Sequence, residues 1–186
     1  MQLKKLPIGI QTFSNIVESN YFYIDKTQDV LEIIEDSKYI FLSRPRRFGK
    51  SLFLDTLRCV YEARKELFDG LYIKDKYDWS KKHPVIKIDF FGDLRSPESL
   101  KKNILGTLRD NQRKLDIKCE DITDFGECFK DLIQKANEKY NQKVVVLVDE
   151  YDKAILDNLD QMDIAFANRE IIKSLYTVLK GCEPYL

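Results

Sequence analysis

The sequence contains little of what a protein needs to hold zinc. It has one histidine, His83, and four widely spaced cysteines that form no CxxC pair: Cys59, Cys119, Cys128 and Cys182. Structural zinc sites usually combine closely spaced cysteines and histidines, so this composition argues against a Cys/His zinc site. We expect all four cysteines to be reduced and mostly buried, as thiols of a cytoplasmic protein usually are.

The chain also lacks an excess of charge of either sign and any long apolar run. Lys+Arg and Asp+Glu both number 31, so the formal net charge is zero. A balanced chain gives no global electrostatic reason to bind nucleic acid or an anionic membrane, and leaves room only for a local basic patch. The N-terminal segment lacks the apolar stretch of a signal peptide, and no run approaches the roughly 20 apolar residues of a membrane span. We therefore expect a cytoplasmic protein without a membrane partner.

Repeats, low-complexity tracts and flexible linkers are missing as well, so the 186 residues predict a single domain. Short apolar runs predict strands at residues 38–45, 83–91 and 143–148. Apolar residues at helical spacing, with capping signals such as Ser96-Pro97, predict helices at residues 51–68, 96–115, 124–140 and 164–180, the last stopped by Gly181. Residues 1–37 are predicted to form an N-terminal strap with a helix from about Thr27. Alternating strands and helices indicate an α/β fold with a mainly parallel sheet.

The loop between the predicted strand at 38–45 and the predicted helix at 51–68 carries the first chemical signal. It reads Arg44-Pro45-Arg46-Arg47-Phe48-Gly49-Lys50-Ser51. The segment meets the phosphate-binding pattern GxxxxGK[ST] in all but the first letter, where Arg44 replaces glycine. In this motif backbone N–H groups and the positive end of a helix face an anion, and Gly49 lets the chain turn close to it.

We predict that this loop binds ATP and Mg²⁺. Lys50 supplies a positive charge for the outer phosphates, and Ser51 supplies a hydroxyl group for the magnesium ion. The predicted nucleotide contacts are Arg44, Pro45, Arg46, Arg47, Phe48, Gly49, Lys50, Ser51 and Leu52. The alternative is a plain strand-to-helix turn with exposed cations. Arg46 and Arg47 in particular either touch the nucleotide or stay solvated.

The second chemical signal is the segment Val144-Val145-Val146-Leu147-Val148-Asp149-Glu150. An apolar strand ending in two acids places carboxylates at the C-terminal edge of a parallel sheet, where ligands bind in open α/β folds. We predict that Asp149 holds magnesium through its water shell and that Glu150 orients and polarises the attacking water. Taken alone, the two acids would indicate a helix N-cap; their position after the phosphate loop favours nucleotide binding. Asp152 either adds to the metal shell or caps a helix, and Asp89 either lines the site edge or only closes its strand.

Five segments together resemble the N-terminal region of the AAA-ATPase-like proteins of bacteria and archaea. They are LPIGIQTF (6–13), YFYIDKT (21–27), FLSRPRRFGKSLFLDTL (41–57), HPVIKIDF (83–90) and VVVLVDEYDKAIL (144–156). The resemblance implies a P-loop NTPase fold, a three-layer αβα sandwich, in which arginine before the loop is a usual variant. It also implies that Tyr23, Asp25 and Lys26 lie near the base or sugar of the nucleotide. From the residues alone, an N-terminal strap with a helix cap at Thr27 is an equal alternative.

Proteins of that family continue into a further strand with a polar sensor residue, a lid and often a PD-(D/E)XK nuclease-like domain. This chain stops at GCEPYL. The further strand would lie between the strand ending at Ser43 and the strand ending at Asp149, and without it two buried edges would lack hydrogen-bond partners. We therefore expect a truncated gene product or a fragment, in which any nucleic-acid partner would be reached only through the missing region.

The leading functional hypothesis is ATP binding with Mg-dependent hydrolysis, in which Lys50 and Glu150 are catalytic and the domain is a motor or switch for an attached or partner module. The alternative is a nucleotide-binding, non-hydrolysing interaction module, or a degenerate fragment. Either role would involve a protein partner or a second copy of the chain. A small-molecule kinase is not supported because no arginine-rich lid is evident, and guanine specificity is not supported because no NKxD motif follows the acidic strand.

Overall fold

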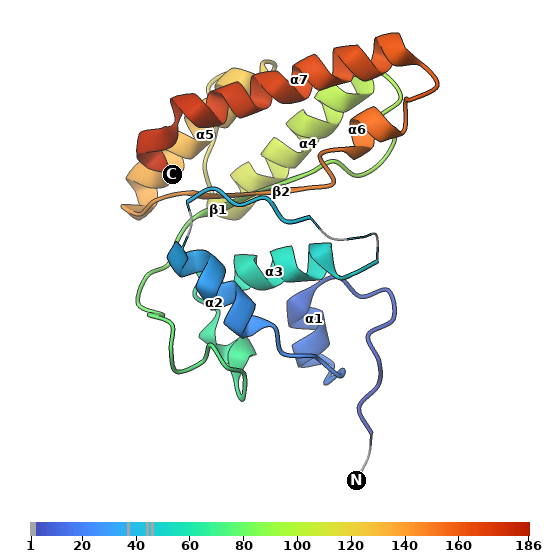
Figure 1. Ribbon diagram of the computed structural model, residues 1–186. Helices are drawn as coiled ribbons and strands as arrows, with labels where there is room; N and C mark the ends of the chain where they lie inside the picture. Colours follow the sequence, from blue (N-terminus) through green and yellow to red (C-terminus); the bar gives the residue numbers. More distant parts are fainter. Residues whose placement is uncertain (1–2, 37, 44, 46) are drawn as a thin grey trace. The chain divides into compact units, whose positions relative to one another are not determined.

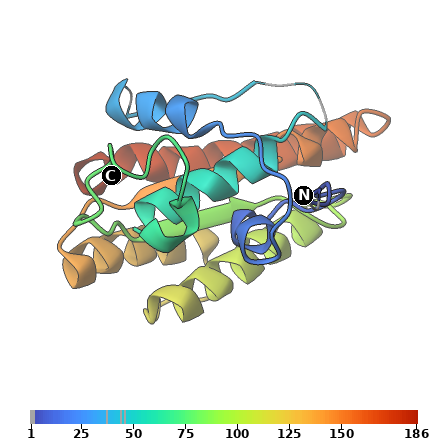
Figure 2. The same cartoon turned by 90° about the horizontal axis from the view of Figure 1, so that it is seen from below.

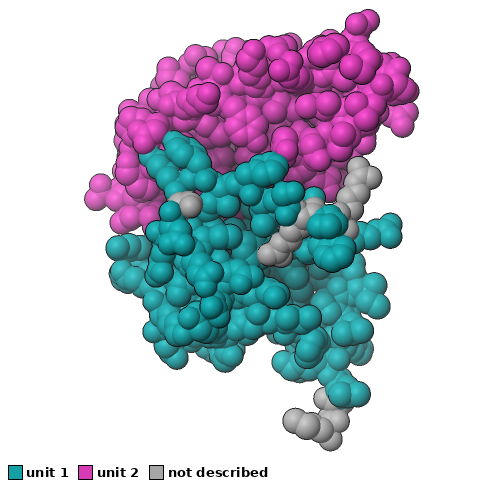
Figure 3. Space-filling model, in the orientation of Figure 1, with its two compact units in different colours: residues 1–82 teal, residues 83–186 magenta. Residues whose placement is uncertain are grey.

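The chain forms two compact units in the computed structural model, which describes residues 3–36, 38–43, 45 and 47–186. Unit 1 comprises residues 1–82 and unit 2 comprises residues 83–186, coloured teal and magenta in Figure 3. Each unit has an apolar core of its own. The assignment of the whole chain to one P-loop domain stays a prediction.

Unit 1 is built from helices packed around aromatic side chains. Its elements are α1 (Phe13–Glu18), α2 (Thr27–Asp36), α3 (Lys50–Tyr61) and the 3-10 helix η1 (Lys65–Phe68) (Figure 1). The rings of Phe13 and Phe68, both fully buried, lie 4.9 Å apart. The buried carboxylate of Asp55 on α3 accepts a hydrogen bond from the backbone N–H of Phe13 (2.8 Å) and pairs with Arg58 (2.8 Å). These contacts hold α1 against α3.

The helix predicted at residues 51–68 is shorter in the structure, because α3 ends at Tyr61. Ala63 adopts a left-handed backbone conformation with φ of 56°. Its N–H donates to the carbonyl of Val60 (2.9 Å), and the N–H of Arg64 donates to the carbonyl of Cys59 (3.0 Å). This is the hydrogen-bond pattern of a Schellman motif, which usually has glycine at the left-handed position. Alanine at that position does not indicate the end of a helix, so the predicted helix extends through η1.

The strand predicted at residues 38–45 is wrong for the residues that the structure describes there, Lys38–Ser43 and Pro45. None of these residues belongs to a strand, and Phe41 is 72% exposed although the prediction placed it in a buried strand. A strand exists only when a neighbour completes its backbone hydrogen bonds. No segment of the described part of unit 1 is a strand.

Unit 2 contains a parallel two-stranded sheet, so the prediction of an α/β fold with parallel strands is confirmed. The strands are β1 (Val85–Asp89) and β2 (Val145–Asp149), paired in register from Val85 with Val145 to Asp89 with Asp149. The connection between them contains α4 (Pro97–Leu115) and α5 (Phe125–Tyr140), and β2 is followed by α6 (Lys153–Leu156), α7 (Met162–Gly181) and the 3-10 helix η2 (Glu183–Tyr185). The two strands run side by side with α4 along them in both ribbon views (Figures 1 and 2).

The two faces of this sheet differ in polarity. Ile86 and Ile88 of β1 belong to the core that α4, α5 and α7 complete, and Val146 and Val148 of β2 pack against the same core. Side chains alternate between the two faces of a strand, so the residues between these ones point to the other face. That other face carries both aspartates that end the strands, Asp89 and Asp149. The helices α4, α5 and α7 pack against the face that carries Ile86 and Ile88. On the other face Val85 and Leu147 are buried as well.

The helices of unit 2 confirm the capping signals read from the sequence. Ser96 and Ser99 form a reciprocal capping box at the start of α4, with Pro97 as the first helical residue, and Asp124 caps α5 by accepting from the N–H groups of Gly126 and Glu127. The helix α7 begins at Met162 and ends at Gly181, so the predicted stop residue is the last residue of the helix. Within the part of the chain that the structure describes, no helix combines the length and apolar composition that crossing a membrane requires.

The prediction of four reduced cysteines is wrong for two of them. A disulfide joins Cys119 to Cys128, whereas Cys59 and Cys182 are free and buried as predicted. The two bonded cysteines are 9 residues apart, and the turn between α4 and α5 brings their Cα atoms to 5.2 Å. Nothing in the residue pattern between them indicated this approach, because it depends on how α5 folds back along α4.

Candidate functional site

The N-terminus of α3 has a glycine at the capping position and no side-chain cap. Gly49 precedes the helix in a left-handed conformation (φ 74°, ψ 24°), and no side chain caps the helix. The first helical hydrogen bond runs from the N–H of Phe53 to the carbonyl of Gly49 (2.9 Å). The N–H groups of Lys50, Ser51 and Leu52 therefore have no acceptor within the helix. Together with the positive end of the helix dipole, they form an arrangement that attracts an anion.

The loop before α3 turns sharply. Arg47 has φ of 67°, and the N–H of Phe48 donates to the carbonyl of Pro45 (3.4 Å). Arg47 and Phe48 are both exposed, and the first turn of α3 contains no acidic residue that would compete with an anion. Contact of these side chains with a nucleotide stays a prediction. Two further predicted contact residues, Arg44 and Arg46, lie outside the described residues.

The carboxyl ends of β1 and β2 carry a second group of candidate residues. Asp89 and Asp149 are register partners in adjacent parallel strands, so both lie on the same face of the sheet at the same edge. Asp149 is only 8% exposed, and its Oδ1 accepts a hydrogen bond from the N–H of Glu150 (3.1 Å). Asp89 pairs with Lys87 of the same strand (3.4 Å). The sheet edge therefore gathers acidic oxygen atoms, as predicted for the end of β2.

Glu150 leaves the strand with an unusual backbone. Its φ is 52°, in the left-handed region that residues other than glycine rarely adopt. The side chain is exposed. Reduced hydration and then the negative charges of Asp149 and Asp89 raise the pKa of the Glu150 carboxyl group above its ordinary value. A carboxylate with a raised pKa binds a proton more readily, which is the property that a general base needs.

Lys153 joins the segments that follow the two strands, and sequence reasoning missed this role. Its ammonium group donates to the carbonyl of Gly92 (2.7 Å), after β1, and pairs with Asp157 (2.7 Å). The only signal in the sequence is the spacing of four residues between Lys153 and Asp157 on one helical turn. A surface hollow of about 420 Å³ lies beside these contacts and is lined by Gly92, Asp93, Arg95, Lys153 and Asp157. Asp152 is exposed and begins α6 without accepting a capping hydrogen bond from its side chain.

The N-terminal segment supports the strap-and-cap alternative for Asp25. Its carboxylate accepts hydrogen bonds from the N–H and hydroxyl of Thr27 (2.8 and 2.7 Å) at the start of α2, and from the N–H of Tyr72 (2.8 Å). Burial alone would raise the pKa of Asp25, but these hydrogen bonds outweigh it and lower the pKa. Tyr23 packs edge-on against Phe13, with ring centroids 5.0 Å apart. Contact of Tyr23, Asp25 and Lys26 with a base or sugar stays a prediction.

The predicted phosphate and metal residues come from both units. Lys50 and Ser51 belong to unit 1, and Asp149 and Glu150 belong to unit 2. Among the described residues, no group of three or more His, Cys, Asp or Glu side chains could hold a metal ion. In nucleotide sites Mg²⁺ takes one or two protein oxygens and completes its shell with phosphates and water. Asp149 and Ser51 each carry an oxygen of the kind that magnesium accepts, and their binding of one common ion stays a prediction.

Comparison with known proteins identifies the family. The chain belongs to the predicted AAA-ATPase family, whose model matches residues 7–186. It is 47% identical over 191 residues to a protein of Azotobacter chroococcum mcd 1 described as an uncharacterized protein in the vnfD 5' region. That alignment covers 100% of this chain and 36% of the relative, so the chain spans about a third of the relative's length. No solved structure matches the chain.

Proposed function

We propose that the chain binds ATP through the N-terminus of α3 and hydrolyses it with the carboxylates that follow β2. The proposal rests on the start of α3, where Gly49 in a left-handed conformation precedes Lys50 and Ser51, with no side-chain cap and no acidic residue in the first turn. Membership of a predicted ATPase family supports it independently. In this proposal residues 44–52 are the Walker A loop, Asp149 and Glu150 are the Walker B pair, and the complete domain is a three-layer αβα sandwich.

In the proposed reaction each named residue has a separate task. The N–H groups of Lys50, Ser51 and Leu52 and the Lys50 ammonium group hold the outer phosphates. A magnesium ion held by Ser51 and Asp149 would supply positive charge for the transferred phosphoryl group. Glu150 accepts a proton from water while the water oxygen bonds to the γ-phosphorus and the bond to the ADP oxygen breaks.

The whole protein's role is proposed at a coarser level. We propose that ATP binding drives a motor or switch motion of an attached or partner module, in the cytoplasm and without a membrane partner. The partner would be another protein or a second copy of the chain, and nucleic acid would be reached only through a further region. The relative extends well beyond the aligned segment, which offers room for such a module in that protein.

Binding is tested by calorimetric titration of Mg·ATP into the parent chain, a Lys50→Ala variant and a Lys101→Ala variant. Lys101 is an exposed lysine near the start of α4, so its removal is a matched control for the loss of a charge near a helix N-terminus. A hydrogen bond to a charged group contributes about 1.5–3 kcal/mol, so Lys50→Ala should weaken binding by roughly 10- to 100-fold. Lys101→Ala should bind as the parent does. Equal binding by all three folded proteins would refute the phosphate loop.

Hydrolysis is tested separately with Glu150→Gln, which keeps the shape of the side chain but cannot accept the proton of water. Turnover should fall by roughly 100-fold or more, in the range that general-base removal usually causes, while Mg·ATP binding persists. Binding without measurable turnover in the parent would instead support the non-hydrolysing interaction module.

A further inference from the structure

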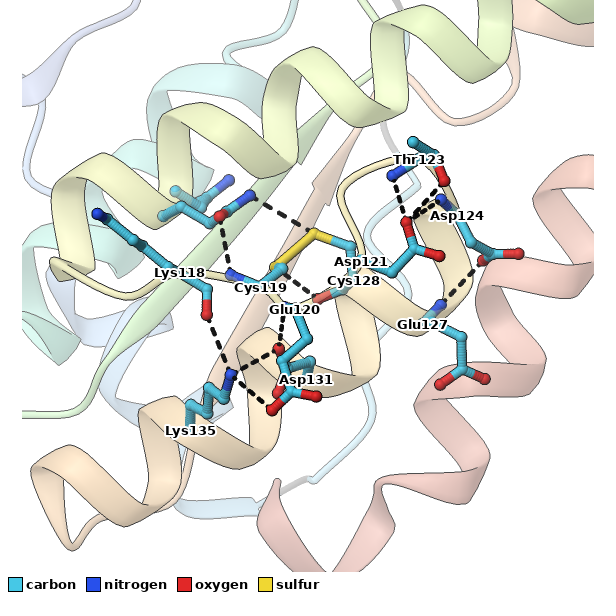
Figure 4. Close-up of a disulfide and its surroundings, with 12 residues drawn as sticks. Lys118, Cys119, Glu120, Asp121, Thr123, Asp124, Glu127, Cys128, Asp131 and Lys135 are labelled. Carbon is cyan, nitrogen blue, oxygen red and sulfur yellow. Dashed lines mark hydrogen bonds and ion pairs between the residues drawn. A yellow bond between two sulfur atoms is a disulfide. The ribbon is translucent and has the colours of Figure 1, made fainter.

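The disulfide of unit 2 connects the turn after α4 to the first helical turns of α5. Figure 4 shows Cys119 at the end of the α4 side of this connection and Cys128 on the helix α5, with the acidic loop residues between them. The Cα–Cα distance of 5.2 Å lies within the usual range of about 4.4–6.8 Å for disulfides. The backbone therefore places the two side chains close enough for a bond to form without moving either element.

Both sulfur atoms also have hydrogen-bond partners that would serve them after reduction. Cys119 Sγ lies 3.1 Å from the carbonyl oxygen of Cys128, to which a Cys119 thiol could donate. The side-chain amide of Gln112 donates to Cys128 Sγ (3.5 Å) and accepts from the N–H of Cys119 (3.0 Å). After reduction, both buried sulfur atoms would therefore have a hydrogen-bond partner. Reduction would then avoid the free-energy cost of leaving a buried polar group unpaired.

The connection between α4 and α5 has non-covalent contacts that do not depend on the disulfide. The N–H of Glu120 donates to Asp131 (2.9 Å), and the ammonium group of Lys135 binds both Asp131 (2.9 Å) and the carbonyl of Lys118 (3.1 Å). These bonds, which Figure 4 marks, tie the loop to α5 on both sides of Cys119. The loop would therefore keep its course when the two sulfurs separate.

The surroundings of the four cysteines single out this pair for exchange. Cys119 is 8% exposed and stands between two exposed residues, Lys118 and Glu120, while Cys128 is 1% exposed. Attack from solvent is therefore favoured at Cys119. Cys59 and Cys182 are free and buried. Burial raises the pKa of Cys59 to about 12, so only a small fraction of this residue is in the reactive thiolate form.

We propose that Cys119 and Cys128 form a reversible disulfide that locks the α4–α5 connection and responds to thiols and disulfides of the surroundings. A dithiol opens it: a reagent thiolate attacks Cys119 Sγ, the S–S bond breaks, and Cys128 leaves as a thiolate that takes up a proton. The second reagent thiol then displaces Cys119, which also takes up a proton. The two cysteines gain two electrons and two protons, and the reagent becomes a cyclic disulfide. A small-molecule disulfide closes the bond by the reverse exchange.

The test uses the intact chain, incubated under native conditions in buffers of reduced and oxidised glutathione at graded ratios. After acid quenching, free thiols are alkylated with a maleimide and the labels are counted by intact mass, with the bonded residues identified in a peptic digest. The oxidised chain should carry two labels, and the bond should join Cys119 to Cys128. Excess dithiothreitol should raise the count to four, and a return to oxidised glutathione should restore two, with an unchanged far-ultraviolet circular dichroism spectrum throughout.

Variants make the result specific. Cys119→Ser and Cys128→Ser should each abolish closure, whereas Cys59→Ser is the matched control that should close as the parent does. Amide hydrogen exchange over residues 116–124 should be at least about threefold faster in the reduced parent than in the oxidised parent, since the lock limits local opening. Failure of the pair to close in oxidised glutathione, loss of helical structure on reduction, or equal exchange rates in both states would each overturn the proposal.

Discussion

Two helices of this chain begin in opposite ways. The start of α4 is closed: Ser96 and Ser99 exchange hydrogen bonds with the backbone, Pro97 removes one N–H, and Glu98 adds a negative charge. The start of α3 is open: Gly49 stands at the capping position, no side chain caps the helix, and Lys50 is the first helical residue. A capping side chain is worth about 1 kcal/mol to a helix, so α3 forgoes a stabilisation that α4 has.

The capped start of α4 is typical of a helix end with a structural role, whereas the uncapped start of α3 is suited to a ligand. At α4 the N–H of Ser99 is satisfied by Ser96, Pro97 has no N–H, and the acidic residue Glu98 matches the positive end of the dipole. At α3 no side chain caps the first turn, and positive side chains would bring an anion to its N–H groups. A missing cap alone would not mark a site; it is the left-handed Gly49, the lysine and the absence of acid that together distinguish α3.

Ser51→Asp would make the start of α3 resemble that of α4 and should produce the largest effect on binding. The new carboxylate can accept hydrogen bonds from N–H groups of the first turn and repels phosphate, so Mg·ATP binding should fall by more than about 100-fold, beyond the effect of removing one charge-assisted contact. The same change should stabilise the fold by roughly 0.3–1 kcal/mol through the helix dipole. Titration calorimetry and thermal unfolding measure the two effects. A variant that binds as tightly as the parent would show that α3 does not hold the phosphates.

Gly49→Ala tests the backbone conformation that opens α3. No atom lies within 4 Å of the position that a Cβ would occupy, so the change meets no obstruction in the described structure. The cost comes from φ of 74°, which L-residues adopt at a penalty of about 1–2 kcal/mol. Urea unfolding should show that loss of stability, with weaker Mg·ATP binding. Gly106→Ala, within α4 and also free of neighbours, is the control that should not destabilise the chain.

Ser96→Ala removes the capping side chain of α4 and makes its start resemble that of α3. Removal of the capping hydroxyl should lower the free energy of unfolding by about 1 kcal/mol, because the N–H of Ser99 loses its acceptor. Mg·ATP binding should not change. Urea unfolding followed by circular dichroism measures the first effect, and calorimetry the second. A gain of phosphate binding at α4 would mean that an open helix end is sufficient by itself.

Glu150→Gln removes a negative charge at the end of β2 and should have the smallest effect on stability of the changes considered. The folded chain raises the pKa of Glu150, so its contribution to stability is full below the unfolded pKa of about 4.3 and is lost as the pH rises through the folded pKa. At neutral pH the variant should therefore be more stable than the parent, by less than about 1 kcal/mol because solvent screens exposed charges. The difference should vanish below about pH 4. The difference is measured by thermal unfolding from pH 4 to pH 8. If a cation stabilised the Glu150 carboxylate instead, the variant would become less stable than the parent as the pH rises.

Local signals made much of unit 2 predictable from the sequence. The helices α4 and α5 start at the residues that Ser96-Pro97 and Asp124 indicate, because a cap acts within one helical turn. The strands β1 and β2 were predictable from short apolar runs. The start of α2 at Thr27 was also predicted, although α1 (Phe13–Glu18) was not, since six residues show too little periodicity.

Features that depend on distant partners were not predictable. Residues 38–43 have the apolar composition of a strand, yet a strand also needs a neighbour that composition does not specify. The disulfide needs α5 to fold back on α4, and the end of α3 rests on an alanine in a conformation usual for glycine. For the candidate site, the sequence indicated which residue types serve phosphate and metal, but not the left-handed backbone of Arg47 and Glu150 or the position of Lys153.

The pairing of Asp89 with Asp149 also protects the sheet from misfolding. Side chains alternate along a strand, so a slip of β2 by one residue would exchange its two faces. Asp149 would then point into the apolar layer beside Ile88, where a carboxylate without a partner is strongly unfavourable. The acid that we assign to magnesium thereby rejects the wrong registers during folding. A side chain that we propose for chemistry thus also helps to specify the register of the strand on which it stands.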